Sequence, residues 1–413
     1  MTPDGVRARL DALREAGARL RARGPQEIMT LLARALDVWS DPASAWRHEL
    51  EAKLPAATGF APETVRRGLS RAFVDWNGDA LRRLAARELA GAHAAFETCA
   101  VVLAGSLPMP TLKALIAPLV LGTPVLVKPA SRDPVTAELV VRSLAEIDPG
   151  LGACVGLAPL SRADAGALDA LLAAECAVVY GDDATIAELS SRSRARRFLA
   201  HGHRLSLAVL GPDAQRGEAL QVAAAGLAED VALWDQLGCL SPLALYAVGA
   251  DAAAADRVAE ALAAALRDAS QRWPRGMVEP AAAARFANER AEAELRAAAG
   301  GGVAVHADPA GLWCVVREAD ARARPAPLHR FVRVHPVRDL PALDAALAPL
   351  RRHLAGVALG GFGAQQPAVA HALAAGGASL VCAPGSLQAP SFAWESEGRG
   401  VLASLARGAA EQG

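Results

Sequence analysis

VLVKPASRDPVTAELVVRSL, residues 125–144, contains the two kinds of segment from which the chain is built. It starts with a short apolar run, typical of a strand buried on both faces of a parallel sheet. Val135, Leu139 and Leu144 then recur at helical spacing and predict a helix. Lys128 lies between them, at the carboxyl end of the expected strand. The stretch therefore predicts a strand, a turn that carries a lysine, and a helix.

The same order of strand and helix extends over residues 99–210. Apolar runs that fit buried parallel strands occur at residues 100–104, 124–127, 177–180 and 205–210. Helical patterns lie between them, and Pro118 is expected to kink or shorten the first of these helices. Alternating strands and helices of this kind predict a doubly wound sheet of the dinucleotide-binding type.

The rest of the chain divides around that domain. Residues 1–98 show helical patterns throughout and are expected to form a helical region packed on the dinucleotide-binding domain, residues 99–210. Residues 211–384 return to strands and helices, so we expect a second α/β domain there. Residues 385–413 form a C-terminal segment. The fold class is thus α/β with two domains, as a length of 413 residues also suggests.

Composition excludes several classes of protein. The formal net charge is −1 and the charges are interspersed, which argues against a nucleic-acid-binding surface. The six cysteines show no C-x-x-C pair, and His201 and His203 have no third ligand nearby, so we predict no metal site. The charge-free tracts are broken by Gly and Pro, which predicts no membrane span. With no signal-peptide pattern at the start, we expect a cytoplasmic protein with reduced thiols.

A candidate nucleophile stands in EDVALWDQLGCLSP, residues 229–242. A helix is expected to run towards Cys239, with Gly238 at its end and Pro242 preventing it from resuming. Cys239 would then lie on a tight loop before a strand at residues 243–248, with backbone N–H groups of the turn facing an anion. The alternative is a small buried hydrophobic residue, which is how most such cysteines behave.

Two strand ends carry candidate ligand-binding groups. Lys128 is one of only three lysines in the chain, and ligands of open α/β sheets bind at the carboxyl ends of strands. The alternative is an ordinary surface lysine. Tyr180, Gly181 and Asp182 link a strand to a helix, where backbone N–H groups could face a cofactor phosphate. An ordinary capped turn explains this second pattern equally well. No G-x-G-x-x-G motif follows a strand.

Together these pieces resemble the acyl-CoA reductase family of the aldehyde dehydrogenase superfamily, over residues 41–398. Residues 230–242 are the most specific part of the resemblance. Residues 235–239 also resemble the Asn-Gln-Gly-Gln-Cys pattern of aldehyde dehydrogenases at large. The resemblance implies that Cys239 is the catalytic nucleophile.

The resemblance also implies a nicotinamide cofactor. Lys128 and Ser131 fall on a Lys-Pro-x-Glu segment whose Lys and Glu contact the adenosine ribose. Ser131 replaces the Glu that would repel a 2′-phosphate, and Arg132 follows it, so we expect NADPH to be preferred, with NADH also possible.

Further cofactor residues are implied at two other places. Tyr180, Gly181 and Asp182 resemble the Gly-Ser turn near the nicotinamide and pyrophosphate. His329 and Phe331 occupy the place of the Glu-x-Phe element beside the nicotinamide ribose.

The sequence departs from the family pattern at three points. Ser106 stands where the family has an Asn that helps to hold the oxyanion, so its side chain is a shorter donor. Residues 198–201 offer no counterpart of the general-base Glu of aldehyde dehydrogenases. Residues 394–398 replace a His-His-Asp-Gly sequence.

The sequence therefore predicts an enzyme that reduces an acyl-CoA, or an acyl-carrier thioester, to an aldehyde. The Cys239 thiolate forms an acyl thioester, and the backbone N–H of Cys239 with Ser106 holds the oxyanion. Two alternatives remain: an acyl transferase that uses the same thioester, and a non-catalytic scaffold of an acyl-activating complex. We expect a homo-oligomer, with an acyl-activating enzyme or synthetase subunit as a possible partner.

Overall fold

The computed structural model describes residues 1–413 except 91–94, 162, 397 and 408–413. The chain divides into two compact units, which are described separately below. Unit 1 comprises residues 1–58, 72–203 and 391–413, and unit 2 comprises residues 59–71 and 204–390.

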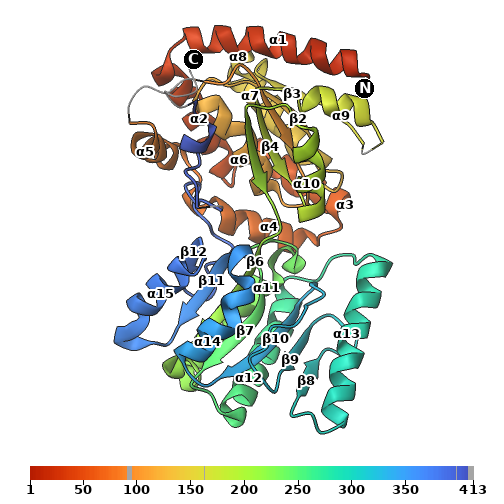
Figure 1. Ribbon diagram of the computed structural model, residues 1–413, viewed down its shortest axis with the longest axis vertical. Coiled ribbons are helices and arrows are strands. Elements are labelled where there is room, and N and C mark those ends of the chain that lie inside the picture. Colours follow the sequence, from red (N-terminus) through yellow and green to blue (C-terminus); the bar gives the residue numbers. More distant parts are fainter. Residues whose placement is uncertain (91–94, 162, 397, 408–413) are drawn as a thin grey trace. The chain divides into compact units, whose positions relative to one another are not determined.

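Unit 1 is built on a five-stranded parallel sheet with the strand order β3-β2-β1-β4-β5 (Figure 1). Its strands are β1 (Cys99–Val102), β2 (Val125–Lys128), β3 (Val155–Leu157), β4 (Cys176–Tyr180) and β5 (Arg197–His201). The chain moves outwards in one direction from β1 to β3 and then crosses to the other side at β4. This is the arrangement of a doubly wound sheet, whose ligands bind where the direction reverses. The predicted fold class is confirmed.

Helices cover both faces of this sheet. They are α1 (Pro3–Ala22), α2 (Pro25–Ser40), α3 (Ala45–Thr58), α5 (Gly78–Glu88), α6 (Pro108–Val120), α7 (Pro134–Ile147), α8 (Pro149–Gly152), α9 (Ala165–Leu171) and α10 (Asp183–Arg192). On one face α1, α9 and α10 pack on alternate strand residues such as Val102, Leu126 and Val179. The apolar side chains at i, i+2 along each strand explain why one layer of helices can bury them. Helix α6 ends two residues after Pro118.

Unit 2 is built on a seven-stranded sheet with the order β12-β11-β6-β7-β10-β9-β8. Its strands are β6 (Leu205–Leu210), β7 (Pro242–Val248), β8 (Ala304–Ala307), β9 (Cys314–Arg317), β10 (Phe331–Val337), β11 (Leu354–Gly360) and β12 (Leu380–Cys382). Only β8, at the edge, runs antiparallel to its neighbour.

The helices of unit 2 again lie on both faces of its sheet. They are α11 (Gly217–Ala232), α12 (Ala252–Arg272), α13 (Pro280–Ala298), α14 (Leu340–Leu347) and α15 (Gln366–Ala375). Helix α4 (Pro62–Ala72), apart from its last residue, also belongs to unit 2. Leu343 of α14 and Leu373 of α15 pack with Val209 and Val357 in one core. Helix α13 contributes Phe286 to a separate cluster beside β9 and β10.

Two sequence-based expectations are wrong. Strand β6 was expected in the dinucleotide-binding domain, but it pairs with β7 and β11 in the sheet of unit 2. The helix before Cys239 ends at Ala232, not at Gly238. Residues 234–236 adopt left-handed backbone angles, which an α-helix cannot continue through.

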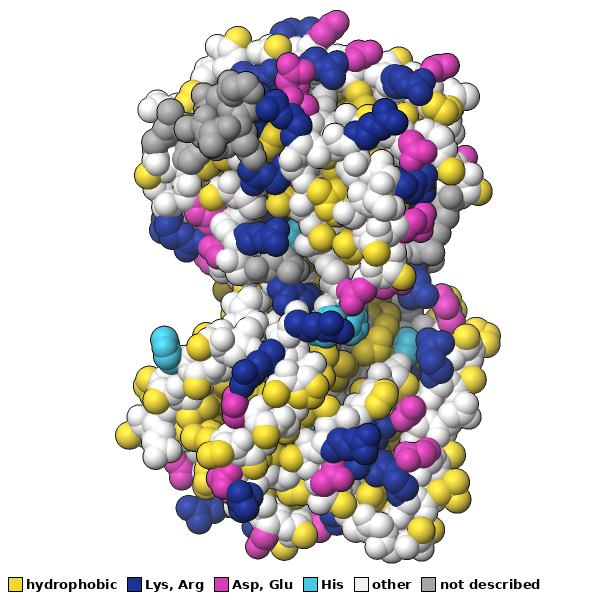
Figure 2. Space-filling model, viewed as in Figure 1, with side chains coloured by type: hydrophobic (Ala, Val, Ile, Leu, Met, Phe, Trp, Pro, Cys, Tyr) yellow, Lys and Arg dark blue, Asp and Glu magenta, His cyan; other side chains and the backbone are white. Residues whose placement is uncertain are grey.

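Two expectations from composition concern the distribution of surface charge and the absence of a membrane-spanning helix. Basic and acidic side chains are interspersed over each unit on the face shown in Figure 2. Among the residues that the structure describes, no helix has the length and apolar character needed to cross a membrane.

Candidate functional site

Cys239 lies in the loop between the 3-10 turn η3 (Leu233–Gln236) and β7, and its side chain is exposed. Hydrogen bonds from the sheet of unit 2 hold the backbone of this loop. The carbonyl oxygen of Cys239 accepts a hydrogen bond from the Ser206 hydroxyl at 2.7 Å, and that hydroxyl accepts one from the Gly356 N–H at 2.9 Å. Strands β6 and β11 therefore fix the position of the cysteine, because Ser206 and Gly356 belong to them.

Two segments of unit 2 have unusual backbone angles. Positive φ values of 50 to 73° occur at Trp234, Asp235, Gln236, Leu328, His329 and Arg330. For residues other than Gly these angles cost energy, and they persist where surrounding contacts enforce them. One segment immediately precedes the Cys239 loop and the other precedes β10.

A buried ion pair joins these two segments. Arg330 donates to the Asp235 carboxylate from Nη2 at 2.7 Å and from Nε at 3.2 Å, and both side chains are buried. The guanidinium also donates to the Ser270 hydroxyl at 3.1 Å and the Ala232 carbonyl at 3.2 Å. The other Asp235 oxygen accepts the Gly276 N–H at 2.9 Å. Burial lowers the pKa of Arg330, an effect that Asp235 opposes. The pair is thus fully hydrogen-bonded, as a buried pair must be.

Gln236 and Phe331, which follow Asp235 and Arg330 in the sequence, join the two segments a second time through hydrogen bonds. The Gln236 amide donates to the carbonyl oxygen of Phe331 at 2.9 Å and accepts the Phe331 N–H at 2.8 Å. It also donates to the Pro242 carbonyl at 2.8 Å. Side chains of two consecutive residues, 235 and 236, therefore hold residues 330 and 331, and this interlock fixes the entry to the Cys239 loop.

A third segment reaches the same region through Asp230, near the end of α11. Its carboxylate accepts the Gly385 N–H at 2.7 Å and the Gln388 N–H at 3.4 Å. The Gln388 amide donates back to the Asp230 carbonyl at 3.1 Å and to the Ser241 hydroxyl at 3.3 Å. Burial raises the pKa of Asp230 to about 7. Gly226 permits this approach, because a Cβ there would lie 2.7 Å from the backbone of Pro384.

Ser106, the predicted oxyanion donor, follows β1 in unit 1. Gly105 has a φ of 86°, which turns the chain before the buried Ser106, and α6 begins at Pro108. The Leu103 N–H donates to the carbonyl oxygen of Lys128 at 3.0 Å. The ends of β1 and β2 are therefore joined directly, and Ser106 and Lys128 follow neighbouring strands.

Lys128 is buried at the end of β2, and its amine lies 3.3 Å from the Pro129 carbonyl oxygen. Ser131 and Arg132 are exposed in the turn that follows. The buried Asp133 caps α7: its carboxylate accepts the N–H of Thr136 at 3.0 Å and the hydroxyl of the same residue at 2.6 Å. Asp133 thus has a structural role in the turn that presents Ser131 and Arg132.

The turn after β4 is a capped helix start. Asp182 accepts the Thr185 N–H at 2.7 Å and is the N-cap of α10. The Asp182 carboxylate is thus engaged at the start of this helix, and its assignment to the cofactor stays a prediction. The Gly181 N–H donates to the His201 carbonyl at 3.2 Å, and the Tyr180 ring stacks on that of His201.

Phe331, the other residue predicted beside the nicotinamide ribose with His329, begins β10. Its ring is completely buried in a cluster with Phe286, Cys314 and Val316. Its backbone is bonded to the Gln236 amide, and its assignment to the cofactor stays a prediction. His329 is buried and has left-handed backbone angles.

The predicted residues thus fall into two groups. In unit 1 the first group lies at or after the carboxyl ends of the adjacent strands β1, β2 and β4. Its members are Ser106, Lys128, Ser131, Arg132, Tyr180 and Gly181. Unit 2 holds Cys239, His329 and Phe331. The first group fits a dinucleotide in two respects. The strand order reverses between β1 and β4, where such sheets bind their ligands, and the buried amine of Lys128 lies at the end of the neighbouring strand β2.

Sequence reasoning missed Asp230, Asp235, Gln236, Arg330 and Ser206. A signal was present for the first three, because they are polar residues in an otherwise apolar stretch before Cys239. Buried polar residues need partners, so each could have been expected to bond to a distant segment.

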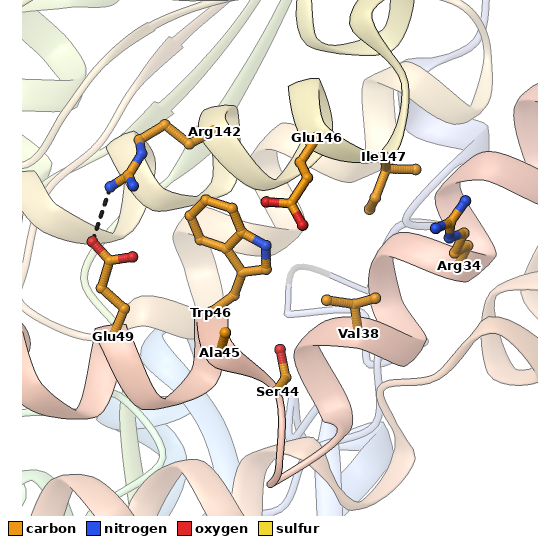
Figure 3. A pocket seen from close by; sticks show the side chains of 9 residues that line it. All are labelled: Arg34, Val38, Ser44, Ala45, Trp46, Glu49, Arg142, Glu146 and Ile147. Atoms are coloured by element: carbon orange, nitrogen blue, oxygen red, sulfur yellow. Dashed lines mark hydrogen bonds and ion pairs between the residues drawn. The ribbon is translucent and has the colours of Figure 1, made fainter.

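A cavity of about 420 Å³ in unit 1 lies away from these groups, between α2, α3 and α7 (Figure 3). Trp46 lies at its centre, with Arg142 over the ring at 5.1 Å and ion-paired to Glu49 at 2.9 Å. None of the predicted site residues lines it.

Comparisons with known proteins bear on the whole chain. A model of the family described as acyl-CoA reductase (LuxC) matches residues 22–407. No curated protein matches.

Solved structures of aldehyde dehydrogenases share the fold. A putative methylmalonate-semialdehyde dehydrogenase from Sinorhizobium meliloti 1021, complexed with NAD, has a TM-score of 0.75 at 14% identity, over 98% of this chain and 89% of that one. An NAD-dependent benzaldehyde dehydrogenase from Corynebacterium glutamicum has a TM-score of 0.72 at 16% identity, over 98% and 89%. Aldehyde dehydrogenase 21 from Physcomitrella patens has a TM-score of 0.69 at 15% identity, over 96% and 84%.

Proposed function

The chain belongs to the acyl-CoA reductase (LuxC) family, and from this we propose that Cys239 carries the acyl group while a thioester is reduced to an aldehyde. Family and fold make the protein an NAD(P)H-dependent oxidoreductase that forms an aldehyde from an acyl thioester. The observation that carries the assignment of the nucleophile is the exposed Cys239 on a loop that two strands and an interlocked backbone hold in place.

In the first step the Cys239 thiolate attacks the carbonyl carbon of the acyl donor. The C–S bond to the donor breaks and a new one forms to Cys239, so one thioester replaces another. The backbone N–H of Cys239 and the hydroxyl of Ser106 are the proposed donors to the oxyanion. One such donor is typically worth about 10²–10³ in rate.

The second step needs no activated water. When bound, the nicotinamide cofactor supplies the hydride. The hemithioacetal on Cys239 then collapses to the aldehyde and the Cys239 thiolate. Residues 198–201 supply no carboxylate to act as a base on water, which favours reduction over hydrolysis of the acyl-enzyme.

Lys128, Ser131 and Arg132 are the residues proposed to hold the adenosine end of the cofactor, with NADPH preferred over NADH. Ser131 and Arg132 are exposed, and Asp133 is engaged as the cap of α7. A charge-assisted contact of about 1.5–3 kcal/mol from Arg132 to a 2′-phosphate corresponds to a preference of roughly 10–100-fold. The comparison is kcat/KM for both cofactors in wild type, Ser131→Glu and Arg132→Ala. Equal values in the wild type would contradict the preference.

The donor is proposed to be an acyl-CoA or an acyl group on a carrier or partner protein. Family membership supports an acyl thioester as the substrate. A panel of acyl-CoA chain lengths, followed by cofactor oxidation, identifies the preferred acyl group.

Mass spectrometry after incubation with acyl-CoA, without cofactor, tests the nucleophile. We expect one acyl group on the peptide that contains Cys239, and none in Cys239→Ala. An adduct on another cysteine would refute the assignment. Addition of NADPH should then release aldehyde; release of acyl product to other acceptors alone would indicate an acyl transferase instead.

A further inference from the structure

Cys239 and a group of basic residues precede neighbouring strands in the sheet of unit 2. The Cys239 loop leads into β7, Arg204 leads into β6, and Arg352 and His353 lead into β11. These three strands are adjacent and parallel, in the order β11-β6-β7. Their amino ends therefore lie along one edge of the sheet, and the nucleophile shares that edge with the basic residues.

The register of the strands shows how close these positions are. Ser206 of β6 pairs with Pro242 of β7, and its hydroxyl donates to the Cys239 carbonyl at 2.7 Å. Leu205, the residue before it, pairs with Leu354, the first residue of β11. Because neighbouring strands lie about 4.8 Å apart, the start of β11 lies roughly 10 Å from the start of β7.

Hydrogen bonds hold the basic side chains at this edge. Arg204 Nη1 donates to the carbonyl oxygens of Arg352 at 3.4 Å and of Leu354 at 3.3 Å. The Arg204 guanidinium therefore links the start of β6 to the start of β11. Arg352 Nε donates to His353 Nε2 at 2.8 Å. The acceptor is thus a ring nitrogen that carries no proton, and the hydrogen bond leaves the charge of the guanidinium in place.

Arg351 and Arg352 are neighbours with different partners. Arg351 is ion-paired to Asp344. Arg352 is exposed, and among the residues that the structure describes it has no carboxylate partner. A guanidinium presents its N–H groups in a planar fork that matches the oxygens of a phosphate. Arg352 is therefore available to a phosphate at this edge, whereas the charge of Arg351 is already matched.

The proposed substrate carries a phosphate at a distance from its reacting carbon. In CoA and on carrier proteins the acyl group is bonded to the sulfur of pantetheine, and a phosphate stands at the other end of this flexible arm. A residue that binds this phosphate must therefore lie apart from Cys239 but at the same edge of the sheet. A separation of two strands, extended by an arginine side chain, meets this requirement.

We propose that Arg352 binds the phosphate of the pantetheine arm of the acyl donor, while Arg204 adds positive charge and His353 holds the Arg352 side chain. This rests on the proposed function, because the thioester on that arm is the bond that Cys239 attacks. The phosphate does not change during the reaction. The contact therefore stabilises the bound donor and the transition state alike, and it should lower KM without changing kcat.

Equilibrium binding tests the site without any reaction. Phosphopantetheine and pantetheine differ only in the phosphate, and neither has the adenosine that the cofactor also carries. Each is titrated by calorimetry into protein without cofactor. Arg352→Gln should weaken binding of phosphopantetheine about 10–100-fold and leave that of pantetheine unchanged. Arg351→Gln is the matched control and should bind both as wild type does. Equal affinities of wild type and Arg352→Gln for phosphopantetheine would overturn the proposal.

Acylation kinetics distinguish the possible sources of the phosphate. Thiol release is measured with acyl-CoA, with an acyl-carrier protein and with acyl-pantetheine. Arg352→Gln should raise KM about 10–100-fold for the first two at unchanged kcat, and leave acyl-pantetheine unaffected. The higher wild-type kcat/KM of the first two then identifies the donor. An effect confined to acyl-CoA would assign Arg352 to the phosphate on its adenosine and refute the contact with the pantetheine arm.

The two proposals fail differently. Normal binding and KM in Arg352→Gln would remove the phosphate site while leaving Cys239 as the nucleophile. A wild-type protein that forms no adduct on Cys239 with any of the three donors would refute the proposed function, and the role of Arg352 with it.

Discussion

Replacing Asp235 by Asn should destabilise unit 2 strongly, although the two side chains are almost the same size. The change removes the negative charge that faces the buried Arg330 guanidinium, and leaves it with the neutral Ser270 hydroxyl and Ala232 carbonyl. Breaking a buried, hydrogen-bonded ion pair from one side costs about 3–5 kcal/mol. The loss arises chiefly from the unpaired buried charge rather than from the missing contact.

Urea unfolding followed by tryptophan fluorescence measures the effect. With a urea dependence of about 3 kcal/mol per M, the midpoint should fall by roughly 1–1.7 M. Asp256→Asn is the matched control in the same unit: its ion pair with Arg317, at 2.6 Å, is partly exposed and should be worth at most about 1 kcal/mol. Arg330→Gln should cost as much as Asp235→Asn, because it leaves the carboxylate buried and unpaired.

The double variant tests whether the loss in each single variant comes from an unpaired buried charge. Two neutral amides can bond to each other, so Asp235→Asn with Arg330→Gln should lose about 2 kcal/mol less than the sum of the single changes. Strict additivity within about 0.5 kcal/mol would refute the account, as would a loss below about 1 kcal/mol in Asp235→Asn. Iodoacetamide should also modify Cys239 at an altered rate in both single variants, because the loop loses its support.

Three further outcomes follow from other contacts. The pKa of Asp230 is raised to about 7, so its protonated form stabilises the folded state fully below about pH 4, and this stabilisation is lost as pH rises through about 7. Asp230→Asn should remove that pH-dependent loss, of which roughly 3 kcal/mol falls between pH 5 and 8, when urea midpoints of variant and wild type are compared over that range. Gly68→Ala would place a Cβ 2.3 Å from the ring of Trp234 and should lower the midpoint by the equivalent of about 1–3 kcal/mol. Ser206→Ala removes the donor to the Cys239 carbonyl and should slow acylation measured by CoA release; an unchanged rate would show that this bond does not position the loop.

Much of the fold could be predicted because buried parallel strands are short apolar runs. The runs at residues 100–104, 124–127 and 177–180 correspond to β1, β2 and β4. Strand β3 has three residues, and β5 begins with Arg and ends with His, so neither shows the pattern. Their places in the sheet come from pairing with β2 and β4 rather than from their own composition.

Strand β6 shows why sequence order does not assign a strand to a sheet. Its apolar run was expected at the right residues, but in the wrong domain. It pairs with β11, whose residues lie about 150 positions later, for example through the Ser206 hydroxyl and the Gly356 N–H. Local patterning carries no information about a partner at that distance.

The site was predictable only where one motif contains the whole signal. The prediction that Cys239 is the nucleophile rests on residues 230–242 alone. The ion pair of Asp235 could not, because Arg330 lies 95 residues away. The helix end was misplaced for the same reason: Gly238 is the locally favoured stop, whereas three left-handed residues from Trp234 onwards are locally unfavourable and are enforced from outside.

The contacts that hold these residues in left-handed conformations connect the stability of unit 2 with the position of the Cys239 loop. All non-glycine residues with positive φ in the described chain fall in the two segments that meet beside the Cys239 loop. Residues in such conformations cost of order 1–3 kcal/mol each, so a fold keeps them only where other contacts compensate. Here the compensation comes from one guanidinium with four hydrogen bonds and one amide with three. A lysine could not replace Arg330, because its single nitrogen cannot reach Asp235, Ser270 and Ala232 from a planar fork. Since a loop preordered in the folded state needs no further ordering when substrate arrives, the strain is best understood as the means by which unit 2 presents the Cys239 thiol.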